Sequence, residues 1–339
     1  MIFDMKGVVM VAVVAVAALG TLSCTSNVSW RTSSGAVWGT TYRITYQADV
    51  DLTDSILAET EAVDRSLSMF RDSSTVSRIN AGTSVIVDSL FRAVFELSQR
   101  VSAASGGRFD PTVAPLVDMW GFGRRVDSGN EVPDSAAVAE ALKGVGIDRC
   151  RIVGDSIVKA HPTTEFDFSA IAKGYGVDRV AAMLRRCGCV NFMVEIGGEI
   201  SLSGHNPRGG LWRIQVDAPV RGAGAPGDSA LTVLELTDCA VATSGNYRNY
   251  RRVGVDSVVG HTISPLTGFP APEGWLSATV IAPECALADA LATALMASPP
   301  ENAARLMGRF ASTKALLVGL DGAVVEIIDG RVVAGAFEP

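Results

Sequence analysis

The segment 166–178 constrains the fold of this chain more than any other. It reads Phe-Asp-Phe-Ser-Ala-Ile-Ala-Lys-Gly-Tyr-Gly-Val-Asp, with a strand-like first half and a second half that starts a helix running to about Arg186. Asp167 therefore leaves a predicted strand end, and Lys173 lies in the first helical turn. Helix-start amides and a lysine attract negative charge, so this corner indicates a site for a phosphate-bearing ligand with a metal. A solvated surface lysine is the alternative interpretation.

The composition describes a chain that can form one or two domains with a sizeable core. It has 339 residues, 48% of them hydrophobic, and a formal net charge of −7. Lysine is scarce and the arginines are scattered, which argues against nucleic acid as a partner. Strands and helices that do not strictly alternate favour a mixed α/β (α+β) class, and neither a boundary nor an internal repeat divides the chain.

The first 24 residues differ from the rest. Lys6 precedes an apolar run over 7–22, and Cys24 follows. A run this short is typical of an export signal rather than a membrane span. We predict a signal peptide over 1–24 whose Cys24 resembles the lipid-modified cysteine of bacterial lipoproteins, although Leu22 lies two positions before it rather than three. An ordinary cleaved signal and a retained anchor are the alternatives.

Residues 25–35 are polar and predict a tether between this lipid and a domain over 36–337. The expected location is outside the cytoplasm, at the cell membrane, facing the periplasm or the cell exterior. Five further cysteines remain, an odd number that cannot all pair internally. With no Cys-x-x-Cys pair and three histidines, a zinc site is not expected, and these cysteines are interpreted as mostly buried small hydrophobes.

Hydrophobic periodicity predicts most of the secondary structure. Helices are expected over 52–67, 90–104, 135–144, 286–297 and 301–310. Strands are expected over 37–46, 190–196, 211–217, 231–236 and 278–282, with a hairpin over 151–158 and further strands between 315 and 333.

An exposed loop is expected over 220–229. Its Gly-x-Gly-x-x-Gly pattern at 222–227 is followed by a strand-like run rather than by a helix, so it is not a dinucleotide-binding fingerprint. The motifs of phosphate-loop NTPases and of common serine hydrolases are absent from the chain.

Asp289 and Thr293 are four residues apart in a predicted helix, so their oxygens share one face. Magnesium prefers such hard oxygen ligands and takes part of its coordination shell from substrate phosphate and water. An acid near a helix start with a threonine bonded back to the helix is the alternative interpretation.

Seven segments, in a fixed order between about residues 36 and 335, resemble the ApbE family of FAD:protein FMN transferases. They are Trp-Gly-Thr-Thr-Tyr at 38–42, Ser-Met-Phe-Arg at 68–71 with Ser-Arg-Ile-Asn at 77–80, Ser-Gly-Gly-Arg-Phe-Asp-Pro-Thr at 105–112 with Trp-Gly-Phe-Gly at 120–123, the corner at 166–178, Val-Glu-Ile-Gly-Gly-Glu-Ile at 194–200 with Val-Ala-Thr-Ser-Gly-Asn-Tyr at 241–247, His-Thr-Ile-Ser-Pro-Leu-Thr-Gly-Phe-Pro at 261–270, and Ala-Asp-Ala-Leu-Ala-Thr-Ala at 288–294.

The resemblance implies a single compact domain with the flavin site between two lobes. It also implies Mg²⁺-dependent transfer of FMN from FAD to a threonine hydroxyl of a partner flavoprotein, which leaves a phosphoester-linked FMN and releases AMP. The implied magnesium ligands are Asp289, Thr293 and the backbone oxygen of Ala170. The residues that it implies for FAD contact are Trp38, Phe70, Arg108, Phe109, Asp110, Asp167, Lys173 and Ile263.

His261 is the best candidate for a catalytic base beside Asp289. Histidine titrates near neutral pH, as a base for a threonine hydroxyl should, and His261 opens one of the resembling segments. His161 and His205 lie outside such segments and are interpreted as structural. The 261–270 segment also departs from the family, which usually has Asp where Ser264 stands and commonly Arg where Leu266 stands. These departures put loop rigidity or acceptor recognition in doubt.

Two other functions use the same residues. One is an FAD-binding lipoprotein that stores or scavenges flavin without transfer, and the other is simple FAD hydrolysis, in which water replaces the threonine. For the segment 109–112, which reads Phe-Asp-Pro-Thr, a turn is the alternative to contact with FAD, because Asp and Pro favour turns.

Overall fold

The structure is a computed structural model that describes residues 28–124, 132–159, 161–219, 229–246, 250–253, 257–272 and 274–334. The predicted signal peptide over 1–24, the first part of the tether, most of the 220–229 loop and residues 335–337 lie outside these residues. No helix in the described ranges is long and apolar enough to cross a membrane.

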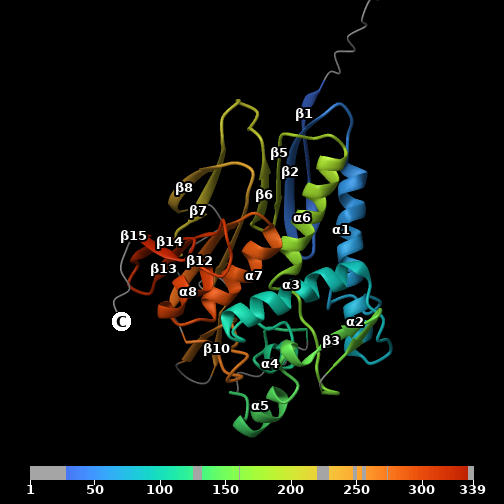
Figure 1. The fold of residues 1–339 in the computed structure, drawn as a ribbon, viewed down its shortest axis with the longest axis vertical. Coiled ribbons are helices and arrows are strands. Elements are labelled where there is room, and N and C mark those ends of the chain that lie inside the picture. Colours follow the sequence, from blue (N-terminus) through green and yellow to red (C-terminus); the bar gives the residue numbers. More distant parts are fainter. Residues whose placement is uncertain are drawn as a thin grey trace, which may run out of the picture.

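A nine-stranded sheet is the largest element of the described structure (Figure 1). Its strands, in spatial order, are β1 (Ser29–Val37), β2 (Thr40–Ala48), β5 (Phe192–Ile196), β6 (Glu199–Ser203), β9 (Ala240–Gly245), β12 (Trp275–Ala282), β13 (Lys314–Gly319), β14 (Val324–Ile328) and β15 (Arg331–Ala334). Every neighbouring pair is antiparallel, which places the chain in the α+β class.

Three two-stranded ribbons accompany the sheet. They are β3 (Arg151–Val153) with β4 (Ser156–Val158), β7 (Trp212–Asp217) with β8 (Ala230–Leu236), and β10 (Tyr250–Val253) with β11 (Ser257–Gly260). The first of them is the hairpin predicted over 151–158.

The helices are α1 (Thr53–Leu67), α2 (Thr75–Asn80), α3 (Ser89–Ser105), α4 (Ala114–Met119), α5 (Ser135–Leu142), α6 (Ala172–Arg186), α7 (Cys285–Met296) and α8 (Ala303–Met307), with 3₁₀ turns at Ile147–Arg149 and Pro300–Asn302. Figure 1 shows α1 and α6 lying beside β2, with α3 and α7 below them. Five predicted helices are present within a few residues of their expected ends, although the last, 301–310, is reduced to a 3₁₀ turn and α8.

The tether predicted over 25–35 is wrong from residue 29 onward, because Ser29–Val37 forms β1. This strand pairs along its whole length with β2, and its edge position lets polar side chains such as Thr32 face solvent. The strand predicted over 37–46 is interrupted, because residue 37 ends β1 and residues 40–46 belong to β2. Trp38 and Gly39, with φ angles of 50° and 74°, make the two-residue turn that separates β1 from β2.

The strand predicted at the start of 166–178 is also absent. The backbone of Phe166 is paired instead with a side chain, since its amide donates to Asn80 Oδ1 at 2.8 Å and its carbonyl accepts from Asn80 Nδ2 at 2.8 Å. Phe166 and Phe168 lie fully buried against Phe91 and Phe95, so this segment belongs to the core without forming a strand of a sheet.

The apolar core has two large parts and two small parts, one of which gathers Leu202, Trp212 and Ile214 from β6 and β7. One large part surrounds α7 and α3, and the other lies between β2, β5, α1 and α6. The other small part joins α4 and α5 to Ile263 and includes Leu116 and Trp120. The lower region of Figure 1, with α4, α5 and β10, therefore forms a lobe distinct from the sheet.

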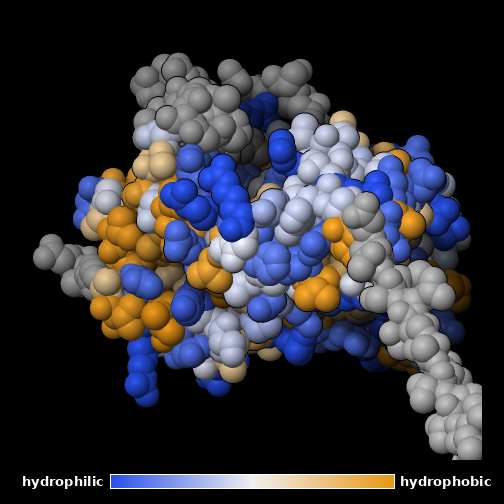
Figure 2. Space-filling model, turned by 90° about the horizontal axis from the view of Figure 1, so that it is seen from above, coloured by the Kyte–Doolittle hydropathy of each residue, from blue (hydrophilic) through white to orange (hydrophobic). Residues whose placement is uncertain are grey.

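The surface is mixed, with apolar groups gathered on one side. Figure 2 shows hydrophobic side chains at the left, the side on which Figure 1 places β7, β8 and the C-terminal strands. Val324, Val332 and Val333 of the last two strands are exposed. Of the five described cysteines, Cys150, Cys189 and Cys285 are buried as predicted, whereas Cys187 is exposed and Cys239 half-buried, and all five are free thiols.

Candidate active site

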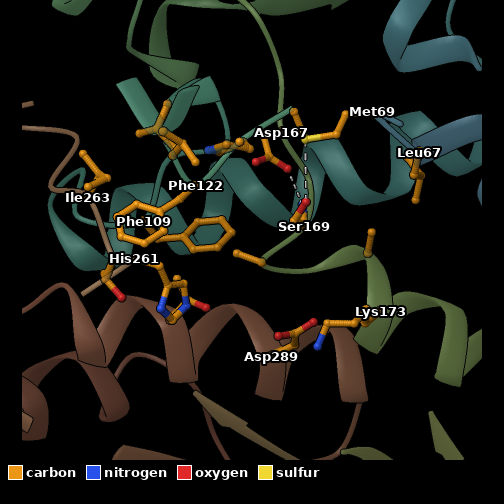
Figure 3. A pocket seen from close by; sticks show the side chains of 18 of the residues that line it. Leu67, Met69, Phe109, Phe122, Asp167, Ser169, Lys173, His261, Ile263 and Asp289 are labelled. Carbon is orange, nitrogen blue, oxygen red and sulfur yellow. Dashed lines mark hydrogen bonds between the residues drawn. The ribbon is translucent and has the colours of Figure 1, made fainter. Parts of the chain in front are cut away.

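A pocket of about 820 Å³ lies between the sheet-backed part of the molecule and the small α4 lobe (Figure 3). A volume of this order suits a ligand as large as a dinucleotide. All twelve residues predicted for the site line this one pocket: Trp38, Phe70, Arg108, Phe109, Asp110, Asp167, Ala170, Lys173, His261, Ile263, Asp289 and Thr293. Their positions span 255 sequence positions, from 38 to 293, so the fold alone brings them together.

One wall of the pocket is made where α6 meets α7. The amide of Gly174 donates to Asp289 Oδ2 at 3.0 Å, and Asp178 on α6 accepts from the first two amides of α7, those of Cys285 and Ala286, at 2.8 Å each. The helices approach so closely that a Cβ on Gly174 would lie 2.4 Å from the Cys285 carbonyl oxygen. Each helix thus supplies an acid that caps the start of the other, which fixes their relative position.

Several residues with side-chain or backbone oxygens line this wall. Asp289 and Thr293 face the pocket from α7, and Thr293 Oγ1 lies 3.2 Å from Ser244 Oγ of β9. The Gly174 amide, which in a regular first turn would bond the Ala170 carbonyl, bonds Asp289 instead, and no bond to that carbonyl is seen in the described part of the chain. A carboxylate, a hydroxyl and a carbonyl are the hard donors that Mg²⁺ prefers.

The same wall carries a buried cluster of charge. Lys173 forms an ion pair with Glu199, the first residue of β6, and Figure 3 shows Lys173 and Asp289 pointing toward one another. Burial lowers the pKa of Lys173, but the charges of Asp289 and Glu199 outweigh it and the net pKa is raised. Burial raises the pKa of Asp289, and Lys173 and the Gly174 amide oppose that rise. Burial and the charge of Asp289 also raise the pKa of Glu199, to about 7, and Lys173 opposes that rise.

In the described residues no three His, Cys, Asp or Glu side chains gather as a metal site. A metal at this wall would therefore depend on one carboxylate, on uncharged oxygens and on a ligand's phosphate. That donor set is too hard and too open for zinc and fits magnesium.

Asp167 and Asp110 also line the pocket, and they differ in how many carboxylate oxygens are left to accept a hydrogen bond from a ligand. Asp167 Oδ1 accepts from the Ser169 amide at 2.8 Å, and burial raises the pKa of this carboxyl. Asp110 uses both oxygens within the fold, Oδ1 for the amide and hydroxyl of Thr112 and Oδ2 for the Ile147 amide. Asp110 therefore performs the turn role that the sequence left as an alternative, while Asp167 keeps an oxygen for a ligand.

Aromatic and apolar side chains form the opposite wall. Figure 3 shows the rings of Phe109 and Phe122 beside one another, with His261 next to them and Ile263 to their left. The His261 and Phe122 rings meet edge to face with centroids 6.3 Å apart. Phe70 is 69% exposed at the rim, so it can cover a ligand without being part of the core.

Trp38 is held at the pocket by backbone and packing. Its φ of 50° is in the left-handed region, and its ring packs so tightly on α6 that a Cβ on Gly176 would lie 2.1 Å from it. The indole Nε1 is buried and has no hydrogen-bond partner within the described ranges.

The segment with the two family departures is closed by backbone bonds. The Ser264 amide donates to the Phe269 carbonyl and the Gly268 amide to the Ser264 carbonyl, both at 2.8 Å, and Trp120 Nε1 donates to the Gly268 carbonyl at 2.8 Å. Loop rigidity therefore does not depend on a charged pair here. Leu266 is exposed and follows the pocket residue Pro265, so a change at this position affects the surface that a protein acceptor would meet at the pocket rim.

The two histidines interpreted as structural lie outside the pocket lining. His161 Nδ1 lies 2.7 Å from Thr163 Oγ1, and His205 Nδ1 lies 3.0 Å from the Asn206 carbonyl oxygen. Several pocket residues had no predicted role, namely Met69, Phe122, Ser169 and Ser244. Each stands inside a segment already noted in the sequence, and that position was the available signal.

The fold and this pocket define a class of protein: a mixed α+β enzyme whose site suits a large phosphate-bearing ligand and a divalent ion. The model of the ApbE family matches residues 38–317. The chain belongs to the ApbE family.

Named relatives agree with this assignment. The chain is 38% identical over 283 residues to an FAD:protein FMN transferase of Vibrio cholerae, covering 79% of this chain and 81% of the relative. It is 33% identical to the FAD:protein FMN transferase of Haemophilus influenzae, covering 86% of each. Among solved structures, the flavin transferase ApbE from Vibrio cholerae has a TM-score of 0.77 at 34% identity, covering 88% of this chain and 96% of that one. The apo flavinyl transferase ApbE of Pseudomonas stutzeri has a TM-score of 0.76 at 30% identity, covering 88% and 96%.

Proposed function

We propose that this chain transfers FMN from FAD to a threonine hydroxyl of a partner flavoprotein, with Mg²⁺ as cofactor and AMP as the second product. The observation that supports it most is that Asp289, Thr293, Ala170 and Lys173 line one part of the pocket, while aromatic rings line another. The first part suits the pyrophosphate of FAD, and the second suits its rings.

The transfer breaks the phosphoanhydride bond of FAD and forms a phosphoester with the threonine. The threonine oxygen attacks the phosphorus of the FMN half, the bond from that phosphorus to the bridging oxygen breaks, and the bridging oxygen leaves with AMP. His261 lies at the pocket beside Phe122 and takes the threonine proton. Lys173 offers positive charge to the phosphates, and Asp167 accepts a hydrogen bond from a hydroxyl or ring NH. Asp289, Thr293 and the Ala170 carbonyl would hold Mg²⁺, which when bound neutralises phosphate charge.

A mixture of the protein, FAD, Mg²⁺ and a flavoprotein acceptor domain tests the proposal. We expect flavin fluorescence on the acceptor band of a denaturing gel, and loss of that band when a chelator removes the metal. Absence of acceptor-linked flavin across several acceptors would count against transfer. Release of FMN and AMP that added acceptor does not redirect would instead identify an FAD hydrolase, and tight FAD binding without either product would identify a flavin store.

We further propose that the chain is exported and anchored by lipid at Cys24, with the domain outside the cytoplasm. The support is the basic residue Lys6, the apolar run over 7–22 and the cysteine that follows. Metabolic labelling with a radioactive fatty acid should mark the wild-type protein and leave Cys24→Ala unmarked. Equal labelling of both, or labelling of neither, would contradict the anchor.

A further inference from the structure

Glu199 is a buried acid that stands directly behind a pocket lysine. It is the first residue of β6 and follows the tight turn of Gly197 and Gly198, whose φ angles are +64° and +99°. The Gly197 amide donates to the Thr41 carbonyl at 3.0 Å, which ties this turn to β2. Lys173 lines the pocket, and Glu199, 3% exposed, does not.

The surroundings of Glu199 require a charged partner. Its Oε1 pairs with Lys173 Nζ, and its Oε2 has no hydrogen-bond partner among the residues that the structure describes. A carboxylate removed from water is costly unless it is paired, so the contact with Lys173 is the one that supports it. An ammonium has three N–H groups, and one bond to Glu199 leaves two for a ligand in the pocket.

Lys173 in turn needs a group that directs it. Its long side chain starts in the first turn of α6, where the positive end of the helix dipole disfavours an ammonium. Asp289 lies close to Lys173, but its Oδ2 is bonded to the Gly174 amide, and the proposed function uses this carboxylate as a metal ligand. Glu199 can hold the lysine from the side away from the pocket without competing for that metal.

We propose that Glu199 is a positioning residue, whose carboxylate holds the Lys173 ammonium so that its remaining N–H groups face the phosphates of a bound flavin nucleotide. The identity of that nucleotide rests on the proposed function. The geometry itself requires only a phosphate-bearing ligand in this pocket, and a binding measurement can examine it without transfer.

The test compares FAD with riboflavin, which carries the same ring system and no phosphate. Both dissociation constants are measured by flavin fluorescence for the wild type, Glu199→Gln and Glu199→Asp, together with melting temperatures. Glu199→Gln keeps the shape and removes the charge, and it should weaken FAD binding about tenfold. Riboflavin binding should be unchanged, and Glu199→Asp should recover part of the FAD affinity. Unaltered FAD binding in Glu199→Gln, or equal weakening of both ligands, would overturn the proposal.

A second arm asks whether Glu199 acts through Lys173. Transfer is measured in Glu199→Gln, Lys173→Met and the double variant, which replaces the ion pair with an uncharged pair of similar size. We expect a loss of about 100-fold in Glu199→Gln, and no further loss when it is added to Lys173→Met. Losses that add would overturn the proposal. If the wild type binds FAD and transfers nothing, the proposed function fails, while the comparison of FAD with riboflavin still decides the role of Glu199.

Discussion

The backbone amide of Gly174 donates a hydrogen bond of 3.0 Å to the carboxylate of Asp289, 115 residues further along the chain. This bond joins the helix that carries Lys173 to the helix that carries the proposed metal ligands. It also takes the Gly174 amide away from the carbonyl of Ala170, a residue that lines the pocket and accepts no hydrogen bond in the described part of the chain. This bond, together with those from Cys285 and Ala286 to Asp178, therefore sets the position of Lys173 relative to Asp289.

Asp289→Asn should separate the metal role from the structural one. The amide oxygen of Asn can still accept from Gly174, whereas the charge that a divalent ion needs is lost. We expect FMN transfer to fall at least about 100-fold with little change in melting temperature. Thr293→Val should follow the same pattern more mildly, because it removes one oxygen and keeps the shape. Full Mg²⁺-dependent activity in Asp289→Asn would refute the assignment.

Gly174→Ala should disturb the junction of α6 and α7. A Cβ at this position would lie 2.4 Å from the Cys285 carbonyl oxygen, so the two helices must move apart. We expect a destabilisation of about 1–3 kcal/mol in urea unfolding, together with a loss of activity. Gly210→Ala is the matched control, because the nearest atom to its Cβ would be 3.7 Å away. Equal stability of the two variants would show that the close approach is not required.

His261→Gln should remove the proposed base without changing the shape of the ligand pocket. Glutamine fills similar space but cannot take a proton from the acceptor threonine. A loss of about 10²–10⁴-fold in transfer is expected, with FAD affinity retained. His161→Gln is the control, since His161 contacts Thr163 outside the pocket lining. If both variants kept full activity, the base would have to be sought elsewhere.

Asp88 should make stability depend on pH at the acid end. Its carboxylate caps α3 through the amides of Leu90 and Phe91 and accepts from the hydroxyls of Ser66 and Thr75. Burial raises its pKa, but these four hydrogen bonds outweigh burial and the net pKa lies below 3.8.

As pH falls, Asp88 of the unfolded chain is therefore protonated before Asp88 of the folded chain. The stabilisation is complete above pH about 4 and is lost as pH falls through the pKa of Asp88 in the folded state. Asp88→Asn should cost about 1 kcal/mol in urea unfolding at pH 7, and the difference from wild type should shrink toward pH 3. A difference independent of pH would contradict this role.

The sequence identified residues that line a common pocket, whereas it missed or misplaced some of the strands. Asp289 and Thr293 could be paired from their spacing alone, because a helix places residues four apart on one face. The strand expected at Phe166 is absent because the side chain of Asn80, 86 positions earlier, takes both of its backbone bonds. No local pattern reports such a distant partner.

Glu199 and Asp178 illustrate the same limit at the site. Both stood in segments that resembled the family, but one pairs with Lys173 across 26 positions and the other caps α7 across 107. Their roles come from tertiary contacts that neither composition nor periodicity encodes. The polar residues of β1 were similarly interpreted as a tether, since an edge strand that faces solvent needs few apolar side chains.

Intact mass measurement of an acceptor domain, after incubation with this protein, FAD and Mg²⁺, tests the central claim most directly. We predict an increase by the mass of FMN less one water on a single threonine, and one AMP released for each modified acceptor. Replacement of that threonine by valine should abolish the increase, as should Asp289→Asn in the enzyme. Release of AMP without any change in acceptor mass would contradict FMN transfer.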